Sequence, residues 1–312
     1  MSALAVVNPR SAAGRTGRDW PRLETALREI FPALHSVTTR TRGEATELVR
    51  AALHAGVSNI IAIGGDGTIN EAVNGFFEHG DAIAPEAVFS FITSGTGGDF
   101  RKSFGISAGP YAALAHLKHA AIRSIDIGRV TCVSAEGGTT VRHFINIASA
   151  GMSGEIVERV NRSLFLRRLG GRMAFALSSA GALMTYRGRK VRLRIDGEID
   201  TTATISTLVI ANGQFFGGGM HVAPHAELDD NHFDVLIMEA VSGRQALADM
   251  GQIYKGTHLD NPSVRALRAS KVLAAPLAAA HGRSVRIEVD GEVAGQLPAT
   301  FEILPNALRV RA

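Results

Sequence analysis

The first part of the chain alternates short apolar runs with segments whose apolar residues recur every three or four positions. Short β-branched runs predict buried strands, and the three-to-four spacing predicts amphipathic helices. We expect strands at Ala3–Val7, Ser36–Thr39, Ile60–Ile63 and Ala87–Ile92, and helices at Trp20–Phe31, Glu44–Ala55, after the third strand and at Pro110–His119. This alternation with short loops predicts a parallel sheet covered by helices on both faces.

The pattern changes at Ile125, where runs of alternating apolar and polar residues begin to dominate. Such runs, separated by Gly-Gly and Asp-Gly pairs, predict antiparallel strands joined by hairpin turns. We expect strands at Ile125–Val133, Thr139–Ala148, Arg189–Ile195, Ile199–Ile210, Phe233–Glu239 and Val285–Val289, with helices at Glu155–Asn161, Gly171–Thr185 and Arg244–Tyr254. The sequence therefore predicts a second, mainly antiparallel domain.

The glycine-rich stretch from Gly64 to Glu71 follows the Ile60–Ile63 run directly. A strand, a glycine turn and a helix N-terminus together favour an anion, because backbone N–H groups point at it and no Cβ blocks its approach. Thr68 and Glu71 have the spacing of a capping box for this helix. A carboxylate at Asp66 would repel a phosphate unless it binds a metal, a ribose or a hydroxyl group. The stretch predicts a nucleotide site, although it is neither a Walker loop nor a dinucleotide fingerprint.

Composition adds limits to this interpretation. The chain has 312 residues, 46% of them hydrophobic and 20% charged, which favours two soluble domains. Its single cysteine, Cys132, excludes an internal disulfide and fits a reducing compartment. The N-terminus does not have the pattern of a signal peptide, and Met173–Tyr186 is too short to span a bilayer. We expect a cytoplasmic protein without a nucleic-acid partner.

Charge is unevenly distributed. The net charge is +4, yet ten basic residues and no acidic one lie between Arg159 and Arg194. In Arg189–Ile195 the basic residues alternate with apolar ones, as on the solvated side of a strand. Upstream, Arg162, Arg167 and Arg168 are interleaved with Leu and Phe, a mixture that suits a membrane interface. The upstream block predicts transient contact with an anionic membrane surface, peripheral at its inner face.

Four further polar segments accompany the glycine-rich stretch. Two follow predicted strands, where ligands of open α/β sheets bind. The others are a long polar loop and a late hairpin turn. The segments are Asn8-Pro9-Arg10-Ser11, Ser94 to Phe100, Asn212 to Asp230, and Asp290-Gly291-Glu292.

In this order the segments resemble the diacylglycerol-kinase-type lipid kinase family, the bacterial lipid kinases related to sphingosine and ceramide kinases. The resemblance implies an α/β nucleotide-binding domain over residues 1–125, to which residues 303–312 return. It also implies a β-sandwich lipid-substrate domain over residues 126–302, with the site between the two. The implied reaction is transfer of the γ-phosphate of ATP to a lipid hydroxyl with Mg²⁺, diacylglycerol or a related glycerolipid being the expected substrate.

The resemblance also implies roles for individual residues. Glu292 would be the general base, with Asp66 and Asp290 as further catalytic residues. Nucleotide contacts would come from Asn8, Pro9, Ser11, Ala12, Thr39, Gly64, Gly65, Asp66, Gly67, Thr68, Asn70, Glu71, Gly95, Thr96 and Asp99. Metal contacts would come from Asp230, from the main chain near Glu227 and His232, and from Asp126.

Some positions depart from the family pattern. Ala12 replaces a glycine, Thr93 replaces a proline, Gly98 replaces an asparagine and Asn231 replaces a glycine. The loss of the side chain at Gly98 removes one implied nucleotide hydrogen bond. A catalytically impaired nucleotide-binding or membrane-sensing protein is therefore one alternative.

The other alternative is an NAD kinase, which shares a Gly-Gly-Asp-Gly loop. Asn70-Glu71 directly after that loop, and a late Asp-Gly-Glu triplet, favour the lipid kinases. The chain has two such triplets, and we expect Asp196-Gly197-Glu198 to be only a hairpin turn, whereas Asp290-Gly291-Glu292 has the functional position. The oligomeric state stays open, with a homodimer among the options.

Overall fold

The computed structural model describes residues 2–94, 98–162, 186–277 and 284–312. The chain divides into two compact units, one formed by Met1–Ile127 with Pro305–Ala312 and the other by Gly128–Leu304. Strand β18 (Glu292–Arg311) contributes residues to both units. No helix among the described residues is long and apolar enough to cross a membrane.

The first unit is built on a parallel sheet in the order β18-β6-β3-β1-β2. The strands are β1 (Ala3–Val7), β2 (Leu34–Thr38), β3 (Asn59–Gly64), β6 (Val88–Thr93) and the end of β18. Every residue of β1, β3 and β6 is buried, because helices cover both faces of the sheet. The returning segment pairs Arg309 with Val88, so the end of β18 lies beside β6.

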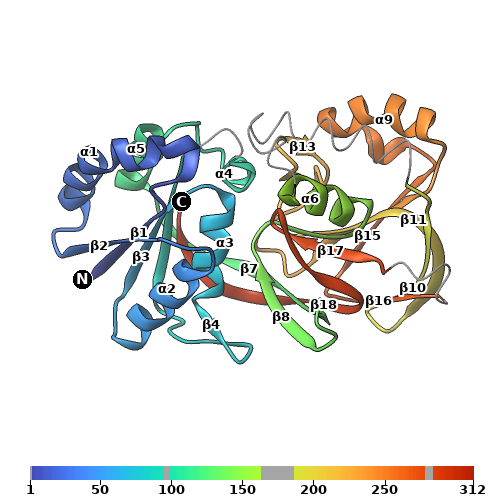
Figure 1. Ribbon diagram of the computed structural model, residues 1–312, viewed down its shortest axis with the longest axis horizontal. Helices are drawn as coiled ribbons and strands as arrows, with labels where there is room; N and C mark the ends of the chain where they lie inside the picture. Colours follow the sequence, from blue (N-terminus) through green and yellow to red (C-terminus); the bar gives the residue numbers. More distant parts are fainter. Residues whose placement is uncertain (1, 95–97, 163–185, 278–283) are drawn as a thin grey trace. The chain divides into compact units, whose positions relative to one another are not determined.

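Helices connect these strands in the alternating pattern that the sequence predicts. They are α1 (Arg15–Ile30), α2 (Glu44–His54), α3 (Asp66–Asn74), α4 (Asp99–Ser103) and α5 (Pro110–His119), with a short 3-10 helix, η1 (Ser11–Gly14), before α1 and the hairpin β4 (Phe77–Glu78) and β5 (Asp81–Ala82) after α3. Helices α1 and α5 contact each other, and so do α2 and α3 (Figure 1). Helix α1 begins at Arg15 rather than Trp20, because its polar first turn carries no apolar signal.

The predicted capping box is wrong. Helix α3 begins at Asp66, its N-cap is Gly65 in an extended conformation, and no side chain caps it. Thr68 therefore lies inside the first turn. Its Oγ1 instead accepts a hydrogen bond from Asn8 Nδ2 at 3.0 Å. A long-range partner thus replaces the local one that the Thr-x-x-Glu spacing favours.

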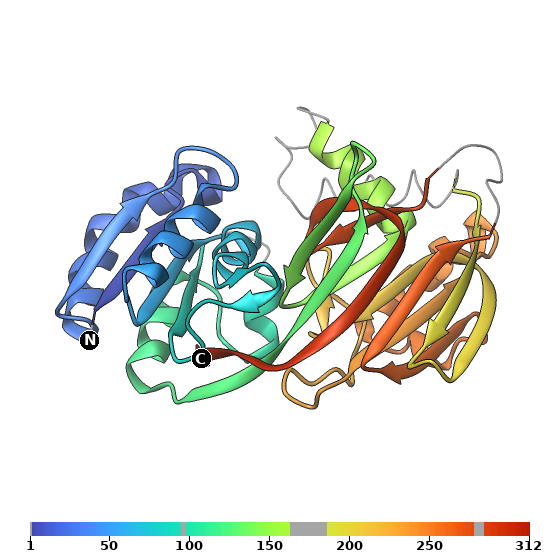
Figure 2. The same ribbon diagram turned by 90° about the horizontal axis from the view of Figure 1, so that it is seen from below.

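The second unit is mainly antiparallel and has two layers of strands (Figure 2). One layer follows the order β15-β14-β11-β10-β16-β18, and the other contains β7, β8, β9 and β17. The strands are β7 (Ile122–Val133), β8 (Thr139–Phe144), β9 (Ile147–Gly151), β10 (Arg189–Ile195), β11 (Ile199–Ala211), β12 (Phe215–Phe216), β13 (Met220–His221), β14 (Phe233–Glu239), β15 (Val264–Ala269), β16 (Lys271–Pro276) and β17 (Arg286–Val289). The helices among the described residues of this unit are α6 (Met152–Arg162), α9 (Gly243–Lys255) and the 3-10 helix η2 (His258–Asp260).

The core of this unit joins both layers. Phe144 of β8 stacks on Phe233 of β14 with ring centroids 5.5 Å apart. A single buried cluster contains these rings together with apolar residues of β10, β11, β16 and β17. The predicted fold class is therefore confirmed: an N-terminal α/β domain with a parallel sheet is followed by a mainly antiparallel β-sandwich.

Two elements predicted for this unit are not found as predicted among the described residues. The strand predicted at Thr139–Ala148 is wrong, because it is two strands, β8 and β9, separated at Ile145–Asn146. The amides of Ile145 and Asn146 donate to the Asp290 carboxylate instead of to a neighbouring strand. The helix predicted at Gly171–Thr185 lies outside the described residues.

Candidate functional site

The predicted nucleotide residues of the first unit gather at one edge of its parallel sheet. Val7 pairs with both Thr38 and Ile63, and Gly64 pairs with Thr93, so the strands end at nearly the same level. The segments after them, which start at Asn8, Thr39, Gly65 and Ser94, consequently share the carboxyl edge. The chain goes from β1 to β2 on one side of β1 and then to β3 on the other, so the strand order reverses between β1 and β3. Ligands of open α/β sheets bind in the crevice at such a point.

Two connections hold the loops after β1 and β3 together. The hydrogen bond from Asn8 Nδ2 to Thr68 Oγ1 joins them across the reversal point. The Asn8 N–H also donates to Ile63 O at 2.9 Å. A Cβ on Gly64 would lie 2.5 Å from Thr68 Oγ1, so only glycine allows this close approach of strand and helix.

Asp66 connects the loop after β3 to the loop after β6. Its Oδ2 accepts hydrogen bonds from the N–H groups of Gly98 at 2.9 Å and of Asp99 at 3.2 Å. Gly98 has a left-handed φ of 63°, a conformation that asparagine also tolerates. The substitution therefore keeps the backbone of this turn and removes only a side chain.

The second carboxylate oxygen of Asp66 is available for a ligand. Asp66 Oδ1 is buried and has no hydrogen-bond partner among the described residues. Burial, with the nearby Asp99 carboxylate as the second cause, raises the pKa of Asp66. Asp99 itself forms an ion pair with Lys102 at 2.7 Å. A bound cation or a donated hydroxyl hydrogen would stabilise the ionised Asp66 side chain at this buried oxygen.

Other predicted nucleotide residues occupy different environments. Asn70 is 1% exposed, and its amide oxygen accepts a hydrogen bond from Asn74, so this side chain lies in the interior of the unit. Thr39 is buried at the end of β2, and its N–H donates to Val7 O at 2.8 Å. Ala12 has a φ of 52°, the left-handed conformation that glycine adopts without strain. Gly95 and Thr96 lie outside the described residues.

In the second unit, the Asp290-Gly291-Glu292 triplet forms the turn between β17 and β18. Asp290 and Gly291 both have positive φ values, 46° and 88°, as a two-residue hairpin turn requires. The Asp290 carboxylate accepts three backbone hydrogen bonds, from Ile145 at 3.0 Å, Asn146 at 3.1 Å and Ile147 at 2.9 Å. Asp290 thus fixes the turn against the β8–β9 connection.

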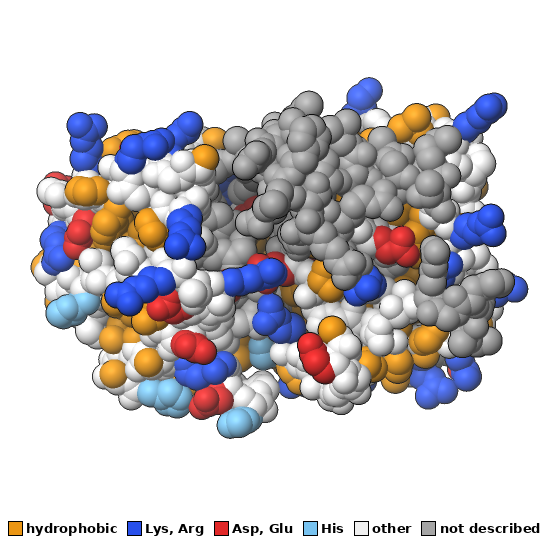
Figure 3. All heavy atoms as spheres, viewed as in Figure 1, with side chains coloured by type: hydrophobic (Ala, Val, Ile, Leu, Met, Phe, Trp, Pro, Cys, Tyr) orange, Lys and Arg blue, Asp and Glu red, His pale blue; other side chains and the backbone are white. Residues whose placement is uncertain are grey.

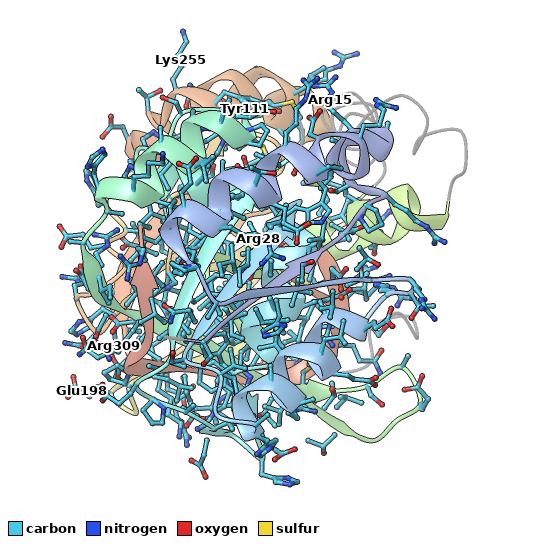
Figure 4. All side chains as sticks on the ribbon, turned by 90° about the vertical axis from the view of Figure 1, so that its left-hand side faces the viewer. Arg15, Arg28, Tyr111, Glu198, Lys255 and Arg309 are labelled. Atoms are coloured by element: carbon cyan, nitrogen blue, oxygen red, sulfur yellow. The ribbon has the colours of Figure 1, made fainter. Side chains whose placement is uncertain are left out.

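Glu292 is differently placed. Its side chain is 16% exposed, and its Oε2 lies 3.4 Å from the guanidinium of Arg142 on β8. A carboxylate that is partly accessible can accept a proton from a ligand. The first triplet offers a contrast, because the Asp196 carboxylate also accepts backbone amides, from Ser270 and Lys271, while Glu198 is exposed and extends from the surface (Figure 4).

The predicted metal residues do not form a side-chain cluster. Among the described residues, no three His, Cys, Asp or Glu side chains come together as a metal site. Asp230 pairs with Arg268, and Asp126 is fully buried and accepts a hydrogen bond from the Asn306 N–H at 2.7 Å. Glu227 and His232 are exposed. The metal assignments, including main-chain oxygens near Glu227 and His232, stay predictions.

Sequence reasoning missed several polar residues around the turn at Asp290. Arg142 contacts Glu292, and Asn146 donates from its side chain to Phe215 O. Ser149 and Glu288 form a buried hydrogen-bonded pair beneath the turn. Only the polar residue Glu288 between the apolar Ile287 and Val289 could have signalled this, and the same pattern is typical of an ordinary half-exposed strand.

Comparisons with known proteins agree with this architecture. Residues 2–130 match the diacylglycerol kinase catalytic domain, and residues 146–312 match the YegS C-terminal NAD kinase beta sandwich-like domain. A probable YegS-like lipid kinase of Chromohalobacter salexigens is 31% identical over 70% of this chain and 67% of its own length. A diacylglycerol kinase of Staphylococcus aureus is 27% identical over 99% of this chain and 92% of its own length.

Solved structures show the same fold at lower identity. A crystal structure of a putative diacylglycerol kinase from Bacillus anthracis covers 99% of this chain and 94% of its own, with a TM-score of 0.79 and 20% identity. A yeast NADH kinase has a TM-score of 0.52 and 13% identity, covering 99% of this chain and 82% of its own. Together, the two matching domain models and this arrangement of a parallel α/β sheet and a β-sandwich define a two-domain kinase. Within that class, the chain belongs to the diacylglycerol kinase family, with a YegS-type C-terminal domain, and is a lipid kinase.

Proposed function

We propose that the protein transfers the γ-phosphate of ATP, with Mg²⁺, to the hydroxyl group of diacylglycerol or a related glycerolipid. The observation that carries this proposal is the bridge made by Asp66 between the two loops at the carboxyl edge of the parallel sheet. That bridge joins the two loops at the position where nucleotides bind in such folds. The partly accessible Glu292 supplies a candidate base.

The proposed reaction divides the work between these groups. Phosphoryl transfer depends mostly on positioning and on neutralising charge, so the loops after β1, β3 and β6 hold the nucleotide. Glu292 takes the proton from the lipid hydroxyl as the hydroxyl oxygen forms a bond to the γ-phosphorus. The bond from that phosphorus to the β,γ-bridging oxygen breaks, and ADP leaves. Arg142 keeps the Glu292 carboxylate oriented. Asp290 fixes the turn that carries the base.

Among the residues of the proposed site, Asp66 is suited to bind a magnesium ion. Mg²⁺ prefers oxygen ligands and is usually bound by one or two carboxylates together with substrate phosphates. The buried Asp66 Oδ1, without a partner among the described residues, is an oxygen of this kind. When bound, the ion would neutralise the charge of the phosphates.

The experiment that tests the proposal offers purified protein labelled ATP and Mg²⁺ with a panel of acceptors. The panel contains diacylglycerol, monoacylglycerol, ceramide and NAD. We expect phosphate transfer to a glycerolipid and none to NAD. The yeast NADH kinase shares the fold at 13% identity, which is why NAD belongs in the panel. Transfer to NAD alone would replace the proposal by the NAD kinase alternative, and transfer to no acceptor would favour an impaired homologue.

The lipid substrate implies contact with an anionic membrane surface, and we propose helix α9 as the surface that makes it. None of the 13 residues of α9 is buried. At 100° per residue, its outward face carries Arg244, Leu247, Tyr254 and Lys255 and no acidic residue. Leu247 is 51% exposed and Tyr254 is 39% exposed. Hydrophobic and basic side chains lie side by side where α9 runs in Figure 3, a mixture typical of interfacial helices.

The acidic residue of α9 is directed elsewhere. Asp249 accepts hydrogen bonds from Gln245 at 2.8 Å and from Asn261 at 3.0 Å. Ile253 packs against the cluster around Val222 and Leu236, so the inward face of α9 contacts the core of its own unit. The sequence predicts the membrane contact at Arg162, Arg167 and Arg168 instead, and Arg167 and Arg168 lie outside the described residues.

Replacing Leu247 and Tyr254 together by serine should weaken binding to phosphatidylglycerol-containing vesicles by roughly tenfold or more, because each side chain buries apolar surface worth about 1 kcal/mol at an interface. Sedimentation with vesicles measures the partition. The matched control is Ile199→Ser, which removes a similarly exposed side chain of β11 in the same unit. Equal partition of the double variant and the control would remove α9 from the membrane contact.

A further inference from the structure

A buried carboxyl group lies directly beneath the turn that carries Glu292. Glu288 of β17 is 2% exposed. Its strand neighbours Ile287 and Val289 belong to the core cluster, so Glu288 points to the opposite side of the strand. Helix α6 packs against β17. The proposed phosphoryl transfer leaves this residue without a role, although burying a carboxyl group has a large free-energy cost.

Three groups satisfy Glu288. Its Oε2 accepts a hydrogen bond from the Gly291 N–H in the turn at 2.9 Å. Its Oε1 lies 2.9 Å from Ser149 Oγ on β9, which is fully buried. Ser149 Oγ lies 2.7 Å from Ser153 Oγ in the first turn of α6. A hydrogen-bonded row thus runs from the turn through Glu288 to α6.

The hydrogens of this row can be counted. Ser149 has one hydroxyl proton but contacts both the carboxyl group and Ser153, so it donates to one and accepts from the other. When Glu288 is ionised, Ser153 donates to Ser149 and Ser149 donates to the carboxylate. When Glu288 is protonated, its O–H donates to Ser149, which then donates to Ser153. Both states keep the two contacts of Ser149, and the Gly291 N–H donates in both.

Several described elements that pack against β17 carry charged or titratable groups: Arg142 and His143 lie on β8, and Glu292 lies on β18. Strand β9 carries no titratable side chain. Among the described side chains of α6, Glu155 lies 3.8 Å from Arg189. Arg286 is on β17, and Asp290 is the charged neighbour that acts on Glu288. Burial raises the pKa of Glu288 to about 7, and the Asp290 charge adds to that rise. The two states are therefore both populated near neutral pH.

We propose that Glu288 is a positioning residue for Glu292, which holds the turn through the Gly291 N–H more firmly when its carboxyl group is ionised. The inference rests on the proposed function of the same turn. A hydrogen bond to a charged acceptor is roughly twice as strong as one to a neutral acceptor. Ionised Glu288 consequently restrains the peptide before Glu292, whereas neutral Glu288 loosens it. The catalytic base then becomes better ordered as the pH rises through neutrality.

Glu288→Gln tests this, because glutamine reproduces the neutral state with the same shape. Its oxygen accepts from Gly291 and its NH₂ group donates to Ser149. We expect the kcat of the wild-type protein on a glycerolipid to rise by about five- to tenfold between pH 6 and pH 8 in a step that Glu288→Gln lacks, with KM for ATP unchanged. Glu198→Gln, after the other Asp-Gly turn, is the control and should keep the wild-type profile. The same pH step in Glu288→Gln would overturn the proposal.

A second measurement is independent of catalysis. In the unfolded chain Glu288 ionises near its ordinary pKa of 4.5, whereas in the folded protein it stays neutral until about pH 7. Between those values ionisation favours the unfolded chain, so stability is lost as the pH rises. Relative to Glu288→Gln, the folded-to-unfolded ratio of the wild-type protein should fall by up to about 300-fold from pH 4.5 to above 7. Parallel stability curves would show that Glu288 does not change charge there and would overturn the proposal.

Amide exchange separates failure of this inference from failure of the proposed function. If no acceptor is phosphorylated, the proposed function fails and the kcat comparison has no meaning. Hydrogen exchange in the peptide that contains Gly291 then decides. Faster exchange in Glu288→Ala than in the wild-type protein supports a role in holding the turn. Unchanged exchange overturns it.

Discussion

Replacing Glu292 by glutamine should abolish most lipid phosphorylation while nucleotide binding stays intact. Glutamine keeps the shape of the side chain but cannot accept the hydroxyl proton, and general base catalysis contributes about 10²- to 10⁴-fold. The residues proposed to hold the nucleotide belong to the first unit, whereas Glu292 and its partner Arg142 belong to the second. We therefore expect kcat to fall by that factor, with ATP affinity within about twofold of the wild-type value.

Single-turnover phosphate transfer and isothermal calorimetry with ATP and Mg²⁺ measure the two quantities. The control is Glu198→Gln, because that residue follows an Asp-Gly turn with the same backbone conformation and is exposed. The loss of the Glu292–Arg142 pair at a partly exposed site should change stability by only about 0.5 kcal/mol. A variant that retained most of its turnover would show that another group accepts the proton.

Replacing Asp66 by asparagine should also abolish activity, but without a loss of stability. In the protein free of nucleotide and metal, burial raises the pKa of Asp66, and the Asp99 carboxylate adds to that rise. A raised pKa means that the ionised side chain opposes folding, and stability falls as the pH rises through the folded-state value. Asparagine can accept the Gly98 and Asp99 amides with its oxygen and carries no charge. The melting temperature at pH 7 should therefore stay equal or increase.

Activity should fall by about 100-fold or more, because asparagine offers no negative charge to a cation or to the proposed nucleotide site. Thermal denaturation and phosphate transfer, measured on the same preparation, give the two results. Asp81→Asn replaces an exposed acidic residue of the same unit and should change neither. If Asp66→Asn lowered the melting temperature by many degrees, the carboxylate would be a structural element of the loops rather than part of a ligand site.

Local pattern was enough to predict most of the fold. The strands of the first unit are buried on both faces, so their apolar runs are unbroken and their alternation with helices is plain. Helix α5 and strand β10 match their predicted limits. The break between β8 and β9 could not be predicted, because the carboxylate that takes the amides of Ile145 and Asn146 comes from Asp290, far along the chain.

In the candidate site, too, the sequence identifies the residues in local motifs but not their long-range partners. Asp66 and Glu292 stand in recognisable motifs, so the sequence alone identifies them. The partners that define their chemistry do not stand in motifs. Arg142 is a single basic residue in a strand of mixed apolar and polar residues, so nothing in the sequence around it indicates a partner. Glu288 has the pattern of a solvent-facing strand residue, and only the packing of α6 on β17 shows that it is buried. The capping box predicted at Thr68 is wrong for a related reason, because the Thr68 hydroxyl accepts a hydrogen bond from Asn8 and does not cap its own helix.

Dissecting this kinase into pieces will require care with strand β18. Its last residues pair with β6 through Arg309 and Val310, and Figure 4 labels Arg309 at this border of the first unit. A recombinant fragment that stopped at Ile127 would leave the backbone N–H and C=O groups of Val88 and Phe89 open on that side. Uncovered strands of this kind recruit a second copy and aggregate. Grafting residues 305–312 back through a flexible linker is the remedy that the topology suggests.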